Sequence, residues 1–106
     1  MNAGIAEYQD QFFTDTLDAE IKLAEPDQRT LTIDMDAASD SVKLAIYYLR
    51  WDEEGGRIIL TSSLAGYLAS AGVLLYSVPK HGMCWFTASL FTAEAWVRDI
   101  EVLMWF

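Results

Sequence analysis

The sequence is poor in cysteine: Cys84 is the only one among 106 residues, so no internal disulfide bond can form. Such usage is typical of proteins from reducing compartments. The first residues include Glu7 and Asp10 and lack the basic stretch that opens a secretory signal peptide. We therefore expect a cytoplasmic protein.

Basic residues are also scarce, since 7 lysines and arginines face 16 aspartates and glutamates and leave a net charge of −9. This balance argues against nucleic acid and against an anionic membrane surface as partners, because both attract basic faces. Between residues 58 and 93 the only permanent charge is Lys80. A lone cation in so apolar a segment either reaches out to water or has a task there.

Residues 58–78 carry no charge and are long enough to cross a bilayer. Serines, threonines and glycines interrupt this stretch, and its local pattern is typical of a strand, a turn and a helix. We therefore expect no membrane segment and keep a small membrane protein as a distant alternative.

Hydrophobic residues make up 53% of the chain, which suits one small domain of buried α/β architecture. RIILTSS, residues 57–63, is a short β-branched run typical of a buried parallel strand. We expect it to lie centrally in a mostly parallel sheet, between helices over 27–51 and 73–85. The first helix is predicted from apolar residues at steps of three and four, namely Leu31, Met35, Ala38, Val42, Ala45 and Leu49.

The carboxyl-terminal residues 84–106 hold three of the four tryptophans. Trp96, Ile100 and Leu103 fall at helical spacing, which predicts a short amphipathic helix capped by Thr92. The apolar run over 102–106 is an unusual end for a soluble chain.

Three residue types in one region can carry chemistry. Tyr76 and Lys80 stand four positions apart, a pair that also arises when an aromatic ring and a lysine stem merely share a helix face. Ser63 ends the predicted strand, is followed by Leu-Ala-Gly, and precedes Tyr76 by thirteen positions. Asn2-Ala3-Gly4 opens the chain ahead of the long predicted helix.

This combination resembles the short-chain dehydrogenase/reductase family, and within it the group similar to 15-hydroxyprostaglandin dehydrogenase. The matching segments are Asn2-Ala3-Gly4, GGRIILTSSLAG (55–66) and YSVPKHG (76–82). The resemblance implies a partial Rossmann-like doubly wound α/β fold that lacks the N-terminal βαβ units. It covers a partial domain over residues 1–83 and leaves 84–106 as a divergent hydrophobic tail.

The resemblance also implies an NAD(P)-dependent oxidoreductase that interconverts an alcohol and a carbonyl. Tyr76 would be the general acid/base, and Ser63 would polarise the substrate oxygen. Lys80 would favour the tyrosinate from one helical turn away and hold the nicotinamide ribose. Asn2 would lie near the adenosine side of NAD or NADP, so the implied cofactor-binding set is Asn2, Tyr76 and Lys80. No metal is implied, and His81 has no cluster of further ligands around it.

Several departures from the family pattern bear on activity. Asp36 falls where the family has a catalytic asparagine, and this carboxylate either disturbs the Tyr76–Lys80 pair or is a solvated helix residue. Pro79 removes a helix N–H beside the catalytic turn. No G-x-x-x-G-x-G phosphate loop occurs in the sequence.

We therefore expect a truncated chain that is inactive by itself. The alternative is a non-catalytic remnant that forms a homo-oligomer or associates with an intact relative through its two long helices.

Overall fold

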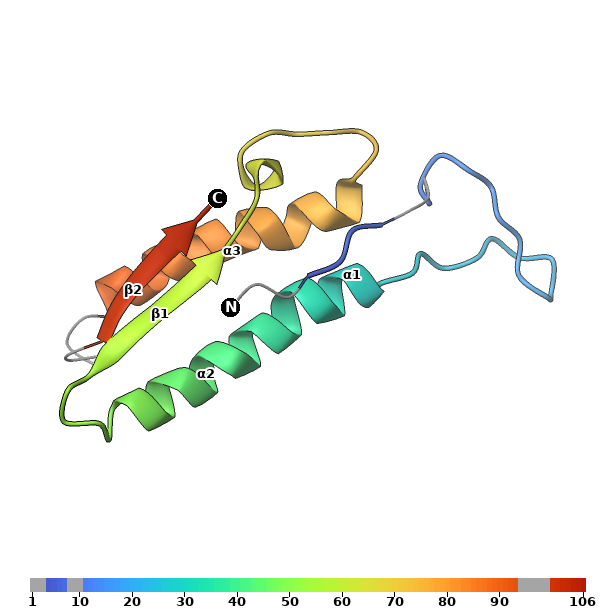
Figure 1. The fold of residues 1–106 in the computed structure, drawn as a ribbon. Coiled ribbons are helices and arrows are strands. Elements are labelled where there is room, and N and C mark those ends of the chain that lie inside the picture. The colour runs from blue at the N-terminus through green and yellow to red at the C-terminus, as the bar shows by residue number, and fades with distance from the viewer. Residues whose placement is uncertain (1–3, 8–10, 94–99) are drawn as a thin grey trace.

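The computed structural model describes residues 4–7, 11–93 and 100–106, and it is an α/β structure with two parallel strands (Figure 1). A short helix, a π-helical turn and a longer helix follow one another directly and form the long helical segment at the lower edge of Figure 1. The elements in chain order are α1 (Arg29–Leu31), η1 (Thr32–Asp36), α2 (Ala37–Leu49), β1 (Gly56–Thr61), the 3₁₀ turn η2 (Leu64–Gly66), α3 (Leu74–Thr92) and β2 (Ile100–Trp105).

The two strands pair in parallel, from Gly56 opposite Ile100 to Thr61 opposite Trp105. Parallel neighbours need a long crossover connection, which α3 provides. Burial alternates along β1, where Leu60 is fully buried while Ile59 is 47% exposed. The helices therefore cover one face of the sheet, and side chains on the other face, such as Ile59 and Leu103, are partly exposed.

The core lies between this covered face and the helices. The two helical segments also contact each other, because α1 and η1 pack against α3. The buried members of the core come from α2, β1, α3 and β2 and comprise Ala38, Val42, Ile58, Leu60, Met83 and Ile100. The predicted parallel strand over 57–63 is thus confirmed over Gly56–Thr61, and its burial is confirmed on one face only, with Ile58 and Leu60. Its predicted central place is wrong for the described residues, whose sheet has two strands. The prediction that it lies between the two helices is wrong, because α2 and α3 pack on the same face.

The long helix predicted over 27–51 is confirmed as a helical segment over Arg29–Leu49, with a π-helical turn at Thr32–Asp36. Its carboxyl end lies close to the start of β1. A Cβ added at Gly56 would come within 2.5 Å of a Leu49 methyl carbon, so the glycine lets the strand leave directly beneath the helix.

The helix predicted from the spacing of Trp96, Ile100 and Leu103 is wrong, because Ile100–Trp105 is the strand β2. Ile100 and Val102 are buried while Glu101 is exposed, so a period of two fits this segment better than steps of three and four. Trp96 lies outside the described residues, and Thr92 ends α3 instead of starting a new helix. Helix α3 also continues well past the predicted end at residue 85.

The uncharged stretch over 58–78 divides into β1, the η2 turn with its loop, and the first turn of α3. Among the described residues, no helix has both the length and the apolar character that crossing a membrane requires.

Candidate active site

The first half of α3 places Tyr76 and Lys80 one helical turn apart and turns both toward the chain's amino-terminal segment. The Lys80 ammonium nitrogen lies 5.2 Å from the centre of the Tyr76 ring, within the range of a cation–π contact. Lys80 is only 7% exposed, so its cation has a specific environment and does not simply reach out to water. Both residues line an open hollow of ≈ 320 Å³, together with Gly4, Ile5, Ala6, Thr61 and Ser62.

A carboxylate that the sequence analysis missed completes this cluster. Asp34 lies within η1, its side chain has 0% exposure, and its Oδ2 atom is 3.9 Å from Lys80 Nζ. Its Oδ1 atom accepts a hydrogen bond of 2.7 Å from the Ile5 backbone N–H. A signal for this residue was available, because Asp34 stands three positions after Leu31 and four before Ala38, inside the apolar stripe of the long helix.

Asp36 stands 27 positions before Ser63, where the resemblance implies the family's asparagine, and is exposed at the end of η1. The carboxylate that the structure brings to Lys80 is that of Asp34. Of the two interpretations of Asp36, its position favours the solvated helix residue.

Ser63 and its neighbour Ser62 have different surroundings. The Ser63 hydroxyl oxygen accepts a hydrogen bond of 3.3 Å from Ala65 N–H and so caps the η2 turn, and Ser63 is not among the residues lining the hollow. The buried Ser62 hydroxyl donates a 3.0 Å hydrogen bond to the Lys80 carbonyl. The structure therefore brings Tyr76 and Lys80 together at the hollow and gives Ser63 a local capping contact. Asn2 lies outside the described residues.

The η2 turn ends at Gly66, where the backbone lies too close to Ser62 and to α3 for a larger residue. A Cβ at this position would come within 2.8 Å of Ser62 Oγ and within 2.9 Å of the Lys80 carbonyl oxygen. Contacts this short do not occur at real Cβ atoms, so η2 packs against α3 only with glycine here. The close approach holds the strand end and the turn of α3 that carries Lys80 in a fixed relation.

The amino-terminal turn of α3 is held from the start of the chain. The Glu7 carboxylate accepts hydrogen bonds from Leu75 N–H at 3.0 and 3.2 Å, which satisfies a donor that has no partner within the helix. Pro79 is the sixth residue of α3 and lacks the N–H that would reach the Leu75 carbonyl. The helix continues through it, with Pro79 fully buried.

No group of three or more histidine, cysteine, aspartate or glutamate side chains within the described parts of the chain could hold a metal ion. His81 is exposed, and its Nδ1 atom forms a 2.9 Å hydrogen bond with the Ser77 carbonyl of the preceding turn.

Comparison with known proteins identifies the family of the chain. The family model described as short chain dehydrogenase matches residues 1–104, which includes β2 and most of the segment that the sequence analysis separates as a tail. The chain belongs to the short-chain dehydrogenase/reductase family, a family of oxidoreductases that generally bind NAD(P).

Curated relatives of the same family come from fungi. The chain is 33% identical over 89 residues to the short-chain dehydrogenase/reductase prx4 of Penicillium roqueforti and of Penicillium rubens, a match of 84% of this chain and 27% of each relative. It is 33% identical over 92 residues to the short-chain dehydrogenase/reductase ascJ of Acremonium egyptiacum, covering 84% of this chain and 30% of that protein. The chain thus spans less than a third of the length of these relatives. No solved structure matches it significantly.

Proposed function

We propose that this chain carries the catalytic turn of an NAD(P)-dependent oxidoreductase that interconverts an alcohol and a carbonyl. The observation that carries the proposal is the shared hollow on which the Tyr76 ring and the buried Lys80 ammonium meet. Family membership supports the reaction class, because a hydride transfer to or from an alcohol carbon needs a partner for the proton on oxygen.

In this proposal Tyr76 exchanges the proton with the substrate oxygen. The Lys80 ammonium, 5.2 Å from the Tyr76 ring centre, stabilises the negative charge that the phenol acquires when it gives up its proton. Ser63 would polarise the substrate oxygen once its hydroxyl turns from Ala65 N–H toward the substrate. When bound, NAD or NADP would supply or accept the hydride.

The hollow suits the nicotinamide ribose end of such a cofactor. Lys80 presents ammonium donors there, and a Cβ at Gly4 would come within 3.3 Å of its nitrogen, so glycine keeps this approach open. Lys80 and Tyr76 are the residues that would hold the ribose, with Asn2 as the predicted contact on the adenosine side. The sequence contains no glycine-rich loop for the pyrophosphate, whose charges such loops neutralise through backbone N–H groups.

We accordingly expect the 106-residue chain by itself to bind neither NADH nor NADPH measurably and to turn over no alcohol. Titration of both nucleotides into the purified chain, followed by nicotinamide fluorescence, tests this expectation. Saturable binding in the micromolar range would show that the pyrophosphate can be held without a glycine-rich loop.

A chimera tests the reaction class itself. The matched segment of Penicillium prx4 is replaced by this chain, and NAD(P)H-dependent turnover is measured with the substrate that intact prx4 uses. We expect measurable turnover with the wild-type segment and loss of at least about a hundredfold with Tyr76→Phe, because the ring still packs while the proton carrier is gone. Tyr47→Phe, on the exposed side of α2, is the matched control. Equal turnover in the Tyr76→Phe and control chimeras would remove Tyr76 from the mechanism.

A second candidate function is association with an intact family member or with another copy of the chain. Its support is the set of large apolar side chains exposed on the two long helices, notably Tyr48 at 69% on α2 and Trp85 at 76% on α3. Sedimentation of the chain alone and mixed with prx4 tests this function, with Trp85→Glu expected to weaken any complex. A wild-type chain that stays monomeric in both samples would exclude it.

The cytoplasmic location and the 15-hydroxyprostaglandin dehydrogenase-like grouping remain predictions.

A further inference from the structure

Asp34 uses its two carboxylate oxygens for different partners. Oδ1 accepts the Ile5 N–H at 2.7 Å, which fastens the amino-terminal segment to the long helix. Oδ2 is buried and accepts no hydrogen bond from the described residues, and the cation that faces it is Lys80, at 3.9 Å. A buried carboxylate oxygen without a hydrogen bond is costly, so its place opposite the ammonium needs an explanation beyond the backbone contact.

We propose that Asp34 is a positioning residue that holds the Lys80 ammonium in place at the hollow; this inference rests on the function proposed above. The two side chains are 9% and 0% exposed for Lys80 and Asp34, so water screens their charges poorly. A buried ammonium is destabilised unless an opposite charge lies nearby. Asp34 supplies that charge from a place outside the lining of the hollow.

The separation of the pair matters for what Lys80 can still bind. At 3.9 Å the two atoms attract each other electrostatically but lie beyond hydrogen-bond distance. The contact with Asp34 therefore uses none of the ammonium's N–H donors and leaves them for hydroxyl groups of a ligand in the hollow. A shorter contact would spend one of these donors on the carboxylate.

The π-helical turn η1 accounts for the placement of Asp34. A π turn inserts an extra residue into the helical register, and such turns are frequent at functional sites. Here the turn spans Thr32–Asp36 and presents Asp34 toward α3 and the Gly4–Ile5 backbone, while Asp36 faces solvent. Two carboxylates two residues apart thus have different surroundings, and Asp36 offers a matched control.

The test measures the reactivity of each lysine in the isolated chain, whose lysines are Lys22, Lys43 and Lys80. The chain is acetylated at neutral pH with limiting reagent, and the rate at each lysine is read by mass spectrometry. We expect Asp34→Asn to raise the rate at Lys80 by about tenfold relative to the other two lysines, because the buried ammonium loses the carboxylate that holds it and its side chain can turn toward the reagent. Asp34→Glu should restore most of the wild-type rate, and Asp36→Asn should change nothing.

Local opening is separated from a charge effect by amide hydrogen exchange in α3. A raised Lys80 rate with wild-type exchange at Met83 and Thr87 supports the proposal. An unchanged Lys80 rate, or a rise that accompanies faster exchange along α3, would overturn it and leave Asp34 with the Ile5 contact alone.

If Asp34→Asn does not fold, the double variant Asp34→Asn with Lys80→Met decides the matter. Removing both charges should recover a folded chain, because the uncompensated ammonium is gone. Failure of the double variant to fold would refute the proposal. No cofactor or substrate enters these measurements, so equal turnover of the Tyr76→Phe and control chimeras counts against the proposed function alone.

Discussion

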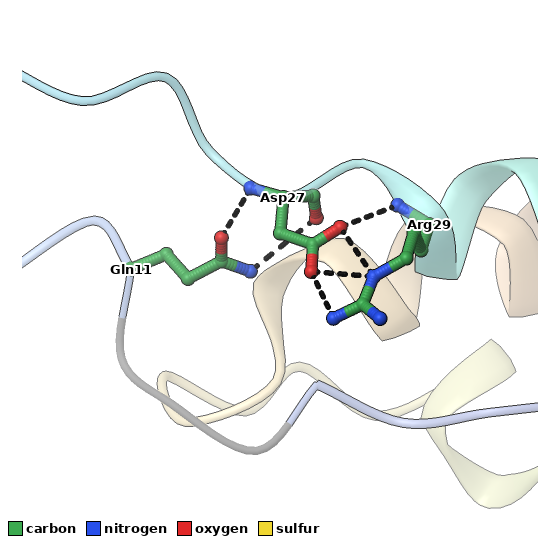
Figure 2. A network of polar contacts seen from close by, with 3 residues as sticks. All are labelled: Gln11, Asp27 and Arg29. Atoms are coloured by element: carbon green, nitrogen blue, oxygen red, sulfur yellow. Dashed lines mark hydrogen bonds and ion pairs between the residues drawn. The ribbon is translucent and has the colours of Figure 1, made fainter. Parts of the chain in front are cut away.

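Two pairs of opposite charges, whose aspartates lie seven residues apart in the sequence, differ in exposure and in the distance between their charged atoms. Asp27 and Arg29 meet at the surface, with Arg29 Nη2 2.5 Å from Asp27 Oδ2 and side chains that are 80% and 44% exposed for Arg29 and Asp27 (Figure 2). Gln11 adds a hydrogen bond of 3.4 Å from its amide nitrogen to the Asp27 carbonyl. Asp34 and Lys80 stand farther apart, at 3.9 Å, but are almost completely buried.

The comparison shows that distance alone does not rank ion pairs. Hydrogen bonds from Arg29 hold the pKa of Asp27 below its ordinary value of 3.8, and Asp27 raises the pKa of Arg29. Exposed pairs of this kind still contribute little to stability, because water and salt screen them and two long side chains must be ordered. A buried pair is different, because the loss of one partner leaves the other charge without compensation.

The largest effect is expected for Asp34→Ala, which removes one partner of the buried pair. We expect a loss of about 3 kcal/mol in the free energy of unfolding, since both the Lys80 ammonium and the Ile5 N–H lose their partner. Urea unfolding followed by tryptophan fluorescence measures the loss. Asp36→Ala is the matched control and should stay within about 0.5 kcal/mol of wild type. Equal effects of the two substitutions would remove the distinction between the buried and the solvated carboxylate.

Gly4→Ala introduces a methyl group against the buried pair without removing a charge. The new Cβ would lie 3.1 Å from Asp34 Oδ1 and 3.3 Å from Lys80 Nζ, so both side chains must give way. We expect a cost of roughly 1 to 2 kcal/mol, typical of overpacking a buried site. Gly72→Ala is the control, because its Cβ would meet nothing within 4 Å. If Gly4→Ala leaves the free energy of unfolding unchanged in the same urea assay, the side chains of Asp34 and Lys80 can move aside at little cost.

The sequence could predict the elements of the fold that depend on local patterns, but not those that depend on contacts between distant segments. The strand at RIILTSS and the long helix before it follow from local patterns, a β-branched run and a stripe at steps of three and four. The carboxyl-terminal strand was missed because Ile100 and Leu103 satisfy helical spacing by chance, while pairing with β1 decides the outcome. That pairing is a contact between residues 44 positions apart, such as Arg57 and Glu101, and no local window contains it.

The site shows the same division. Tyr76 and Lys80 could be paired from their spacing, because one helical turn always brings such residues together. Asp34 could not be assigned by counting from Ser63, since the count led to Asp36 and the helix contains a π turn there. The contact of Ser62 with the Lys80 carbonyl is equally hidden, because it depends on how closely Gly66 lets η2 approach α3.

A smaller effect is expected where the amino-terminal segment holds α3. Glu7→Ala removes the carboxylate that accepts the Leu75 N–H and should cost about 1 kcal/mol, as for the loss of other helix caps. Glu7→Gln keeps an acceptor oxygen and should recover about half of that loss. Hydrogen exchange at Leu75 reports the same change locally. Unaltered exchange in Glu7→Ala would show that another group caps the helix.

The smallest effect is expected at the surface pair of Figure 2, where Asp27→Asn removes the charge but keeps an oxygen that can accept the Arg29 N–H. The pKa of Asp27 is lowered in the folded chain, so its contribution is fully present above the ordinary value of 3.8 and is lost as the pH falls below it. At neutral pH we expect only a slight lowering of the urea midpoint, because screening leaves the exposed pair little to contribute. In the acid range the wild type should lose its slight advantage over the variant, so the two unfolding curves converge. Midpoints measured from neutral pH down to about pH 3 check this, with Asp52→Asn as an exposed control. A large neutral-pH loss in Asp27→Asn, comparable to that of Asp34→Ala, would reverse the ranking of the two pairs.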